Sequence, residues 1–257
     1  MIRRIILAAF YIASLGLISP NGVAYGDEAV MVITEDYPPL NYLEDNVLKG
    51  PSVEIVRLIK ARLGDVSPIK TYPWARGYKY LETRKNTALF STTRSQKREP
   101  LFKWVGPLAE KKIGLFAKKG RGIKLGSLED AKAYVIGVQR QGHGMQYLQE
   151  RGFKMFDQST TAAANLKKLM LGRNDLWFAS NATLVGNAGR LKVNVSDFEL
   201  VLEVDNTFMS IAFHKETPDG TIKRWQAAYD ALVKEGVVKE IFKKHGLETL
   251  YPTGFEK

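Results

Sequence analysis

The chain has 257 residues, no cysteine and a formal net charge of +11 at neutral pH. The lack of cysteine excludes disulfides, thiolate metal sites, cysteine nucleophiles and a cysteine-linked lipid anchor, so the fold must be stabilised by its own hydrophobic core. The lysines are scattered over expected helices and loops and form no basic stripe. We therefore attribute the charge to solubility and to mild attraction of anions, and we expect no nucleic-acid partner.

The first 26 residues have the pattern of a secretory signal peptide. Arg3 and Arg4 precede an apolar stretch at 5–18, and the small residues Ala24 and Gly26 suit a cleavage site. The apolar stretch is shorter than the roughly 20 residues that span a bilayer, which argues against a membrane anchor. We therefore predict cleavage near Gly26 and a periplasmic location.

Beyond this segment, short β-rich runs alternate with amphipathic helical patterns. The expected strands lie at 29–34, 69–72, 87–90, 113–117, 134–138, 176–179 and 208–214. The expected helices lie at 52–63, with Ser52 as its cap, and at 75–83, 128–131, 161–171, 222–233 and 238–242. Strands that alternate with helices predict a parallel sheet and an α/β fold.

Polar loops follow five of these strands, at 35–42, 72–76, 91–99, 139–144 and 180–183. Ligands of α/β proteins gather beyond the carboxyl ends of the strands, and in two-lobed proteins they gather between the lobes. We therefore expect the five loops to converge on one cleft.

The strongest binding signal lies in the loop at 91–99. The hydroxyls of Ser91 and Thr93 and the guanidinium groups of Arg94 and Arg98 follow the end of an apolar strand. Arginine matches a carboxylate through two parallel hydrogen bonds, and hydroxyls can fill the remaining lone pairs. The same residues are also typical of a solvated basic loop. Their place after a strand favours a site for a small acid.

The order of motifs along the chain resembles solute-binding protein family 3, the periplasmic binding proteins of polar amino acid uptake systems. The motifs are EDYPPLNY, KGPSVEIVRLI, PWARGYKYLETRKNTALFSTTRSQKREPLFKWVGP, IGVQRQGHGMQYL, LKKLMLGRNDLWFAS and MSIAFHKETPDGTIKRWQAAYDALVKEGVVKEIFKKHG. The resemblance implies a type II periplasmic-binding-protein fold, in which two α/β lobes are joined by two crossing strands. Lobe one would comprise 27–107 and 207–257, and lobe two 108–206. It further implies a monomer that closes on its ligand without a cofactor.

The resemblance also implies roles for particular residues. Thr93 and Arg98 would hold the ligand's carboxylate, with Arg94 as a competing candidate. Tyr37 and Trp74 would flank the ligand with their rings, and a cation over Trp74 would gain further attraction. Arg140 would contribute a polar contact from lobe two.

One position departs from the family pattern. Amino-acid binders of the family place an aspartate after the strand at 176–179 to pair with the ligand's α-ammonium, whereas this chain has Ser180 and Asn181. An ammonium group in a closed cleft normally needs a negative partner. Either Glu35 or Asp36 supplies it, or the ligand is not an ordinary α-amino acid.

The predicted function is capture of a small carboxylate-bearing solute, an amino acid or a related polar compound, for uptake by an ABC transporter. The transporter's membrane permease is the candidate protein partner. A sensor or adaptor that signals to a membrane receptor and a dehydratase-like enzyme on the same fold remain alternatives. The sequence shows no paired-carboxylate, Ser-His-Asp or metal-spaced motif, and we expect His143, His214 and His245 to be structural or exposed. This favours binding over catalysis.

Overall fold

The computed structural model describes residues 29–253, and the predicted signal peptide lies outside them. The strands are β1 (Met31–Thr34), β2 (Tyr42–Glu44), β3 (Val47–Lys49), β4 (Lys70–Thr71), β5 (Thr87–Arg94), β6 (Phe102–Lys118), β7 (Ile136–Gln139), β8 (Phe156–Ser159), β9 (Leu176–Ser180) and β10 (Phe198–His214). The α-helices are α1 (Pro51–Arg62), α2 (Trp74–Thr83), α3 (His143–Gln149), α4 (Ala162–Met170), α5 (Asn181–Leu191), α6 (Asp219–Lys234) and α7 (Val237–Lys244).

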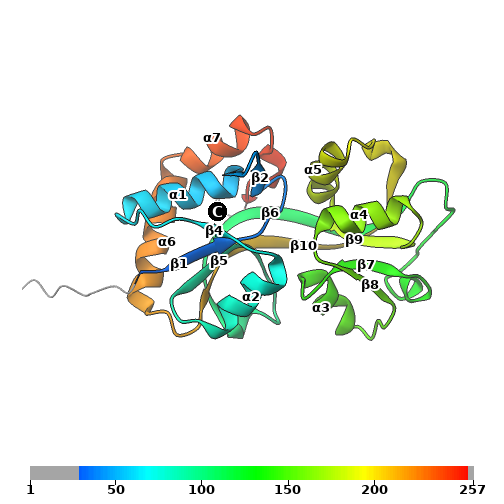
Figure 1. The fold of residues 1–257 in the computed structure, drawn as a ribbon, viewed down its shortest axis with the longest axis horizontal. Coiled ribbons are helices and arrows are strands. Elements are labelled where there is room, and N and C mark those ends of the chain that lie inside the picture. The colour runs from blue at the N-terminus through cyan, green and yellow to red at the C-terminus, as the bar shows by residue number, and fades with distance from the viewer. Residues whose placement is uncertain (1–28, 254–257) are drawn as a thin grey trace, which may run out of the picture.

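Two long strands, β6 and β10, run through both halves of the molecule as an antiparallel pair (Figure 1). The sheet order is β4-β1-β5-β10-β6-β9-β7-β8. Strands β4, β1 and β5 are parallel on one side of this pair, and β9, β7 and β8 are parallel on the other. The protein thus has the predicted architecture of two α/β lobes joined by two crossing strands.

Each lobe has three layers. In lobe one, α1, α6 and α7 pack on one face of the sheet through residues such as Ile55, Tyr229 and Phe242, and α2 packs on the other through Tyr78 and Leu81. The same division recurs in lobe two, where α3 covers one face and α4 and α5 the other. Burial of these apolar stripes fixes the strand ends that carry the polar loops.

The hydrophobic clusters separate along the crossing strands. In β6 the cluster of lobe one ends at Ala109 and that of lobe two begins at Ile113, and in β10 the change falls between Val204 and Met209. This separation is consistent with the predicted boundaries at 107 and 206, whose exact positions stay a prediction.

The predicted cap of α1 is wrong. Gly50 occupies the N-cap with a φ of 114°, and Ser52 is buried in the first turn without capping. A side chain at Gly50 would begin 2.4 Å from the carbonyl oxygen of Leu40, so the chain needs glycine there.

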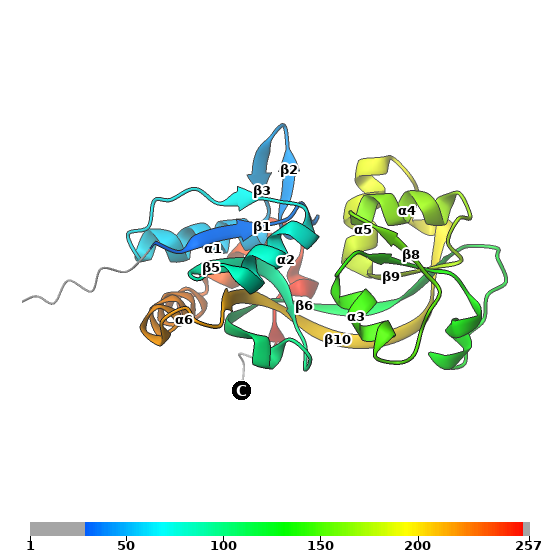
Figure 2. The same cartoon turned by 60° about the horizontal axis from the view of Figure 1, so that its bottom comes forward.

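The sequence did not predict the β2–β3 hairpin, α3, β8 or α5. The hairpin projects from lobe one on the side where α4 and α5 rise from lobe two (Figure 2). Among residues 29–253, no helix combines the length and apolar character required to cross a bilayer.

Candidate functional site

A cavity of about 70 Å³ lies between the two lobes, and all five predicted loops contribute to its wall. Its lining residues are Glu35, Tyr37, Trp74, Ser91, Thr93, Arg98, Lys111, Ile113, Gln139, Gly142, His143, Gly144, Ala162, Asn165, Trp177, Phe178, Ala179, Ser180, Thr183 and Met209. The expected convergence of the loops on one cleft is therefore confirmed. Within the described residues, no group of three or more histidine, aspartate or glutamate side chains is arranged to hold a metal ion.

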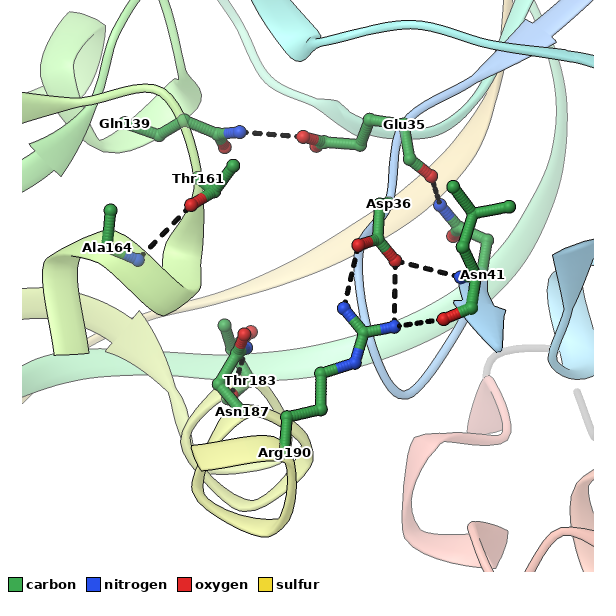
Figure 3. Close-up of polar contacts among 10 residues, drawn as sticks. Glu35, Asp36, Asn41, Gln139, Thr161, Ala164, Thr183, Asn187 and Arg190 are labelled. Carbon is green, nitrogen blue, oxygen red and sulfur yellow. Dashed lines mark hydrogen bonds and ion pairs between the residues drawn. The ribbon is translucent and has the colours of Figure 1, made fainter. Parts of the chain in front are cut away.

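The lobes contact each other directly around this cavity. The amide Nε2 of Gln139 donates a hydrogen bond to Glu35 Oε2 at 2.6 Å (Figure 3). The indole Nε1 of Trp74 donates to the carbonyl oxygen of Gln141 at 2.9 Å. The structure therefore shows the lobes closed, with side chains of lobe one hydrogen-bonded to lobe two.

Arg98 also links the two lobes. Its Nε donates to Gln146 Oε1 at 2.9 Å, and its Nη2 lies 3.5 Å from the carbonyl oxygen of Gln141, both in lobe two. Its Nη1 donates to the carbonyl oxygen of Thr93 at 3.3 Å within lobe one. These bonds hold the guanidinium plane in a fixed orientation at the wall of the cavity.

Arg98 forms no direct ion pair with an acidic side chain of the described chain. The side chain is 0% exposed and its guanidinium carbon lies 5.2 Å and 4.9 Å from the ring centres of Trp74 and Tyr78. Burial lowers its pKa, although Tyr78 and the charges of Glu35 and Glu82 act in the opposite direction. Neutral acceptors and aromatic faces offset only part of the cost of burying a cation, so the site favours an incoming anion.

Glu35 faces the cavity from the loop after β1 and is 7% exposed. Burial raises its pKa to about 7, although the hydrogen bond from Gln139 and the charges of Lys111 and Arg98 act in the opposite direction. Glu35 therefore changes its protonation state near neutral pH.

Three further polar side chains at the cavity have buried atoms without hydrogen-bond partners. They are Ser91 Oγ, His143 Nε2 and both amide atoms of Asn165. Burial, together with the nearby charges of Arg98 and Lys111, lowers the pKa of His143 to about 3, so the imidazole is neutral. Buried polar atoms are normally satisfied, and these point to a polar ligand.

Ser91 owes its position to an irregularity in the sheet. The register of β5 against β10 shifts between Ser210 and Ala212, and Ser91 has a φ of 55° at this bulge. A bulge of this kind redirects a side chain that a regular strand would point elsewhere.

Seven of the ten predicted site residues line the cavity and three do not. Arg94 is on the surface, where its Nε donates to Glu99 Oε2 at 2.7 Å. Arg140 and Asn181 are exposed and are absent from the cavity wall. The structure does not place these three at the cavity wall: Arg94 pairs with Glu99 on the surface, and Arg140 and Asn181 are exposed outside the lining.

Ser180 lines the cavity, but its hydroxyl also caps α5. Its Oγ accepts a hydrogen bond from the backbone N–H of Thr183 at 3.1 Å and lies 2.8 Å from Thr183 Oγ1. Thr183 in turn lies 2.7 Å from the hydroxyl of Tyr37, across the cleft. The polar chain from Ser180 to Tyr37 therefore joins the two lobes at one wall of the cavity.

Sequence reasoning missed several residues of the wall. Lys111 comes from the crossing strand β6, and its Nζ donates to the Tyr37 hydroxyl at 3.1 Å. His143 and Asn165 lie on α3 and α4. The sequence offered a partial signal for His143, which stands in one of the predicted loops, but none for Lys111 or Asn165, which follow no strand end.

An ion pair closes the cleft outside the cavity. Arg190 on α5 donates from Nη1 to Asp36 Oδ2 at 2.7 Å and from Nη2 to Asp36 Oδ1 at 2.9 Å (Figure 3). Its Nη2 also donates to the carbonyl oxygen of Leu43 at 2.9 Å. We name this contact the Asp36–Arg190 latch. The carboxylate of Asp36 is thus paired with Arg190, and Asp36 does not line the cavity.

Two crossing strands, two α/β lobes and a polar cavity between them define a protein that encloses a small solute. The sequence model of the bacterial extracellular solute-binding proteins, family 3, matches residues 29–248, and the chain belongs to this family. No curated protein sequence matches it significantly.

Solved structures share the fold at low sequence identity. A histidine kinase sensor domain with similarity to periplasmic binding proteins matches with a TM-score of 0.78 and 20% identity, over 88% of this chain and 98% of that one. An ancestral arginine-binding protein bound to arginine matches at 0.73 and 19%, over 85% and 98%. The arginine-, lysine-, histidine-binding protein ArtJ from Geobacillus stearothermophilus matches at 0.72 and 19%, over 84% and 94%.

Proposed function

We propose that the protein captures a small carboxylate-bearing solute between its lobes and delivers it to the permease of an ABC transporter in the periplasm. The observation that carries this proposal is the fully buried Arg98, which forms no direct ion pair within the described chain. A bound carboxylate supplies the missing countercharge and can accept two parallel hydrogen bonds from the guanidinium group.

The other cavity residues have supporting roles in this proposal. The hydroxyls of Ser91 and Thr93, near the end of β5, line the cavity and can donate hydrogen bonds to the carboxylate. Tyr37 and Trp74 supply apolar surface from lobe one. The cavity is lined from both lobes, so the solute can contact all of its partners only when the lobes are closed. Ligand binding therefore favours lobe closure.

A thermal-shift screen tests this proposal. The panel contains amino acids, 2-hydroxy acids, 2-oxo acids, dicarboxylates, short peptides and the amide analogue of each acid. A ligand at 100 times its dissociation constant should stabilise the folded protein by about 2.7 kcal/mol. An acid should shift the melting temperature and its amide should not.

Two variants locate the carboxylate partner. R98M should abolish the shift, because it removes the buried guanidinium group, whereas R94M should retain it, because Arg94 pairs with Glu99 on the surface. A panel in which no acid stabilises the protein, or a shift that survives R98M, would refute the proposal.

A sensory role is a second candidate, and one observation favours it. The structural match with a TM-score of 0.78 is a histidine kinase sensor domain. Transport and sensing differ in the native host. Deletion of the gene should abolish uptake of the labelled ligand if the protein serves a transporter. Normal uptake with loss of the ligand's transcriptional response would instead support sensing.

A further inference from the structure

The charges that face the cavity are unevenly divided between the lobes. Arg98 and Lys111 carry positive charge, and Glu35 is the one carboxyl group among the lining residues. Lobe two contributes no acid, and its polar lining groups include Gln139, His143 and Asn165. The ligand must therefore balance its charge against two cations and a single carboxyl group.

We infer that the solute of this site is a carboxylic acid without an α-ammonium group. The class that fits the charges and polar groups of the cavity is a 2-hydroxy or 2-oxo acid. The inference rests on the proposed function, since it describes the acid that Arg98 would hold. An ionised monoacid and an ionised Glu35 balance the charges of Arg98 and Lys111. An α-amino acid adds a third cation to the same closed space and leaves one positive charge without a partner.

The protonation of Glu35 does not reverse this count. Its carboxyl group already accepts a hydrogen bond from Gln139 at 2.6 Å, and burial raises its pKa to about 7. When Glu35 holds a proton, the cavity has no negative side chain at all. In either state an ammonium group adds one positive charge that a hydroxyl or oxo group in its place does not add.

The unpartnered polar atoms suit the same class of solute. His143 Nε2 is buried without a partner and can accept a hydrogen bond from a 2-hydroxyl group if the ring proton is on Nδ1. Asn165 offers an unpartnered amide that can donate to an oxo group or accept from a hydroxyl group. These neutral groups satisfy hydrogen bonds, but they cannot supply the countercharge that an ammonium group requires.

Matched triplets of acids provide the test. Isothermal titration compares the monoacids lactate, pyruvate and alanine, then phenyllactate, phenylpyruvate and phenylalanine. Within the triplet that binds, the hydroxy or oxo acid should bind at least ~10-fold more tightly than the amino acid. This is a difference of ~1.4 kcal/mol in binding free energy.

A charge added at the cavity should shift this preference. Ser180 lines the cavity and caps α5, and aspartate is an equally good cap, so S180D should fold normally. It should reduce the preference for the hydroxy or oxo acid over the amino acid at least ~10-fold. N181D adds the same charge at the neighbouring exposed residue and should leave the preference unchanged.

Removal of a cation should act in the same direction. K111M should reduce the preference for the hydroxy or oxo acid over the amino acid, because one positive charge fewer then faces the ammonium group. K112M removes a lysine at an exposed neighbouring position and should leave this preference unchanged. An amino acid that binds the wild-type protein as tightly as its hydroxy and oxo analogues overturns the inference and leaves the proposed carboxylate site intact. If none of the acids binds, the proposed function and the inference fail together. An unchanged preference in S180D, with folding retained, also overturns the inference.

Discussion

Replacement of Glu35 by glutamine should raise the free energy of unfolding of the ligand-free protein at pH 8 and have much less effect at pH 5. Glutamine fits the same space, and its oxygen can still accept the hydrogen bond from Gln139. The pKa of Glu35 rises from 4.5 to about 7 in the folded protein, chiefly through burial. Since one pKa unit corresponds to about 1.4 kcal/mol, ionised Glu35 costs the folded state about 3 kcal/mol at pH 8.

The direction follows from the protons that each state binds. Between pH 4.5 and about 7, folded Glu35 keeps a proton that the unfolded chain has released. The free energy of unfolding of the wild-type protein therefore falls as pH rises through this window. In E35Q this contribution is absent. His143 is present in both proteins, so its own titration cancels in the difference between them.

Urea unfolding at pH 5, 6, 7 and 8 measures this difference. The stability gain of E35Q should grow from below about 1 kcal/mol at pH 5 to about 3 kcal/mol at pH 8. E203Q removes an exposed carboxylate and serves as the control, for which the difference should stay within about 0.5 kcal/mol at every pH. A gain that is independent of pH, or largest at pH 5, would refute the reasoning.

Two further predictions concern the closed state. A Cβ at Gly186 would lie 2.9 Å from the carbonyl carbon of Pro38 across the cleft, so G186A should hinder closure and weaken acid binding about 10-fold. The control is G189A, where a Cβ would meet open space. It should leave binding unchanged and stabilise α5 by about 1 kcal/mol. Equal affinities of the two variants by isothermal titration would contradict the role of this contact. The Asp36–Arg190 latch is partly exposed, so D36N should weaken binding only about two- to fivefold, and less at high salt. A loss above about 50-fold would show that the latch contributes more than a surface ion pair does.

The apolar periodicity of most elements predicted the α/β class, and the family resemblance implied the two lobes and their crossing strands. It missed α5 because the segment contains Gly186 and Gly189, which lower helix propensity, and because Ser180 and Asn181 resemble a loop. Ser180 is in fact the cap that starts this helix. A polar residue at a strand end predicts a turn and a helix cap equally well.

The crossing strands set another limit on prediction. The residue pattern predicted only 113–117 of β6, because Gly106 and Pro107 interrupt the β pattern of its first half, and the crossing between the lobes was implied by the family resemblance alone. Lys111 lies between these parts and enters the cavity through the crossing of the lobes. Such a position depends on the packing of two lobes and leaves no local pattern in the sequence.

The sequence also left Arg94 and Arg98 as rivals, since both follow the same strand. The structure separates them by burial and by partner, with 46% of the Arg94 side chain exposed beside Glu99 and Arg98 enclosed against Trp74. Charge and spacing alone carry no information on which of two neighbouring arginines is buried.

The crystal structure of the protein with its tightest-binding acid tests the central claim most directly. We predict that the carboxylate lies between the lobes with its oxygens about 2.7–2.9 Å from the guanidinium nitrogens of Arg98. A carboxylate bound to Arg94, or one held by Lys111 without contact to Arg98, would contradict the claim.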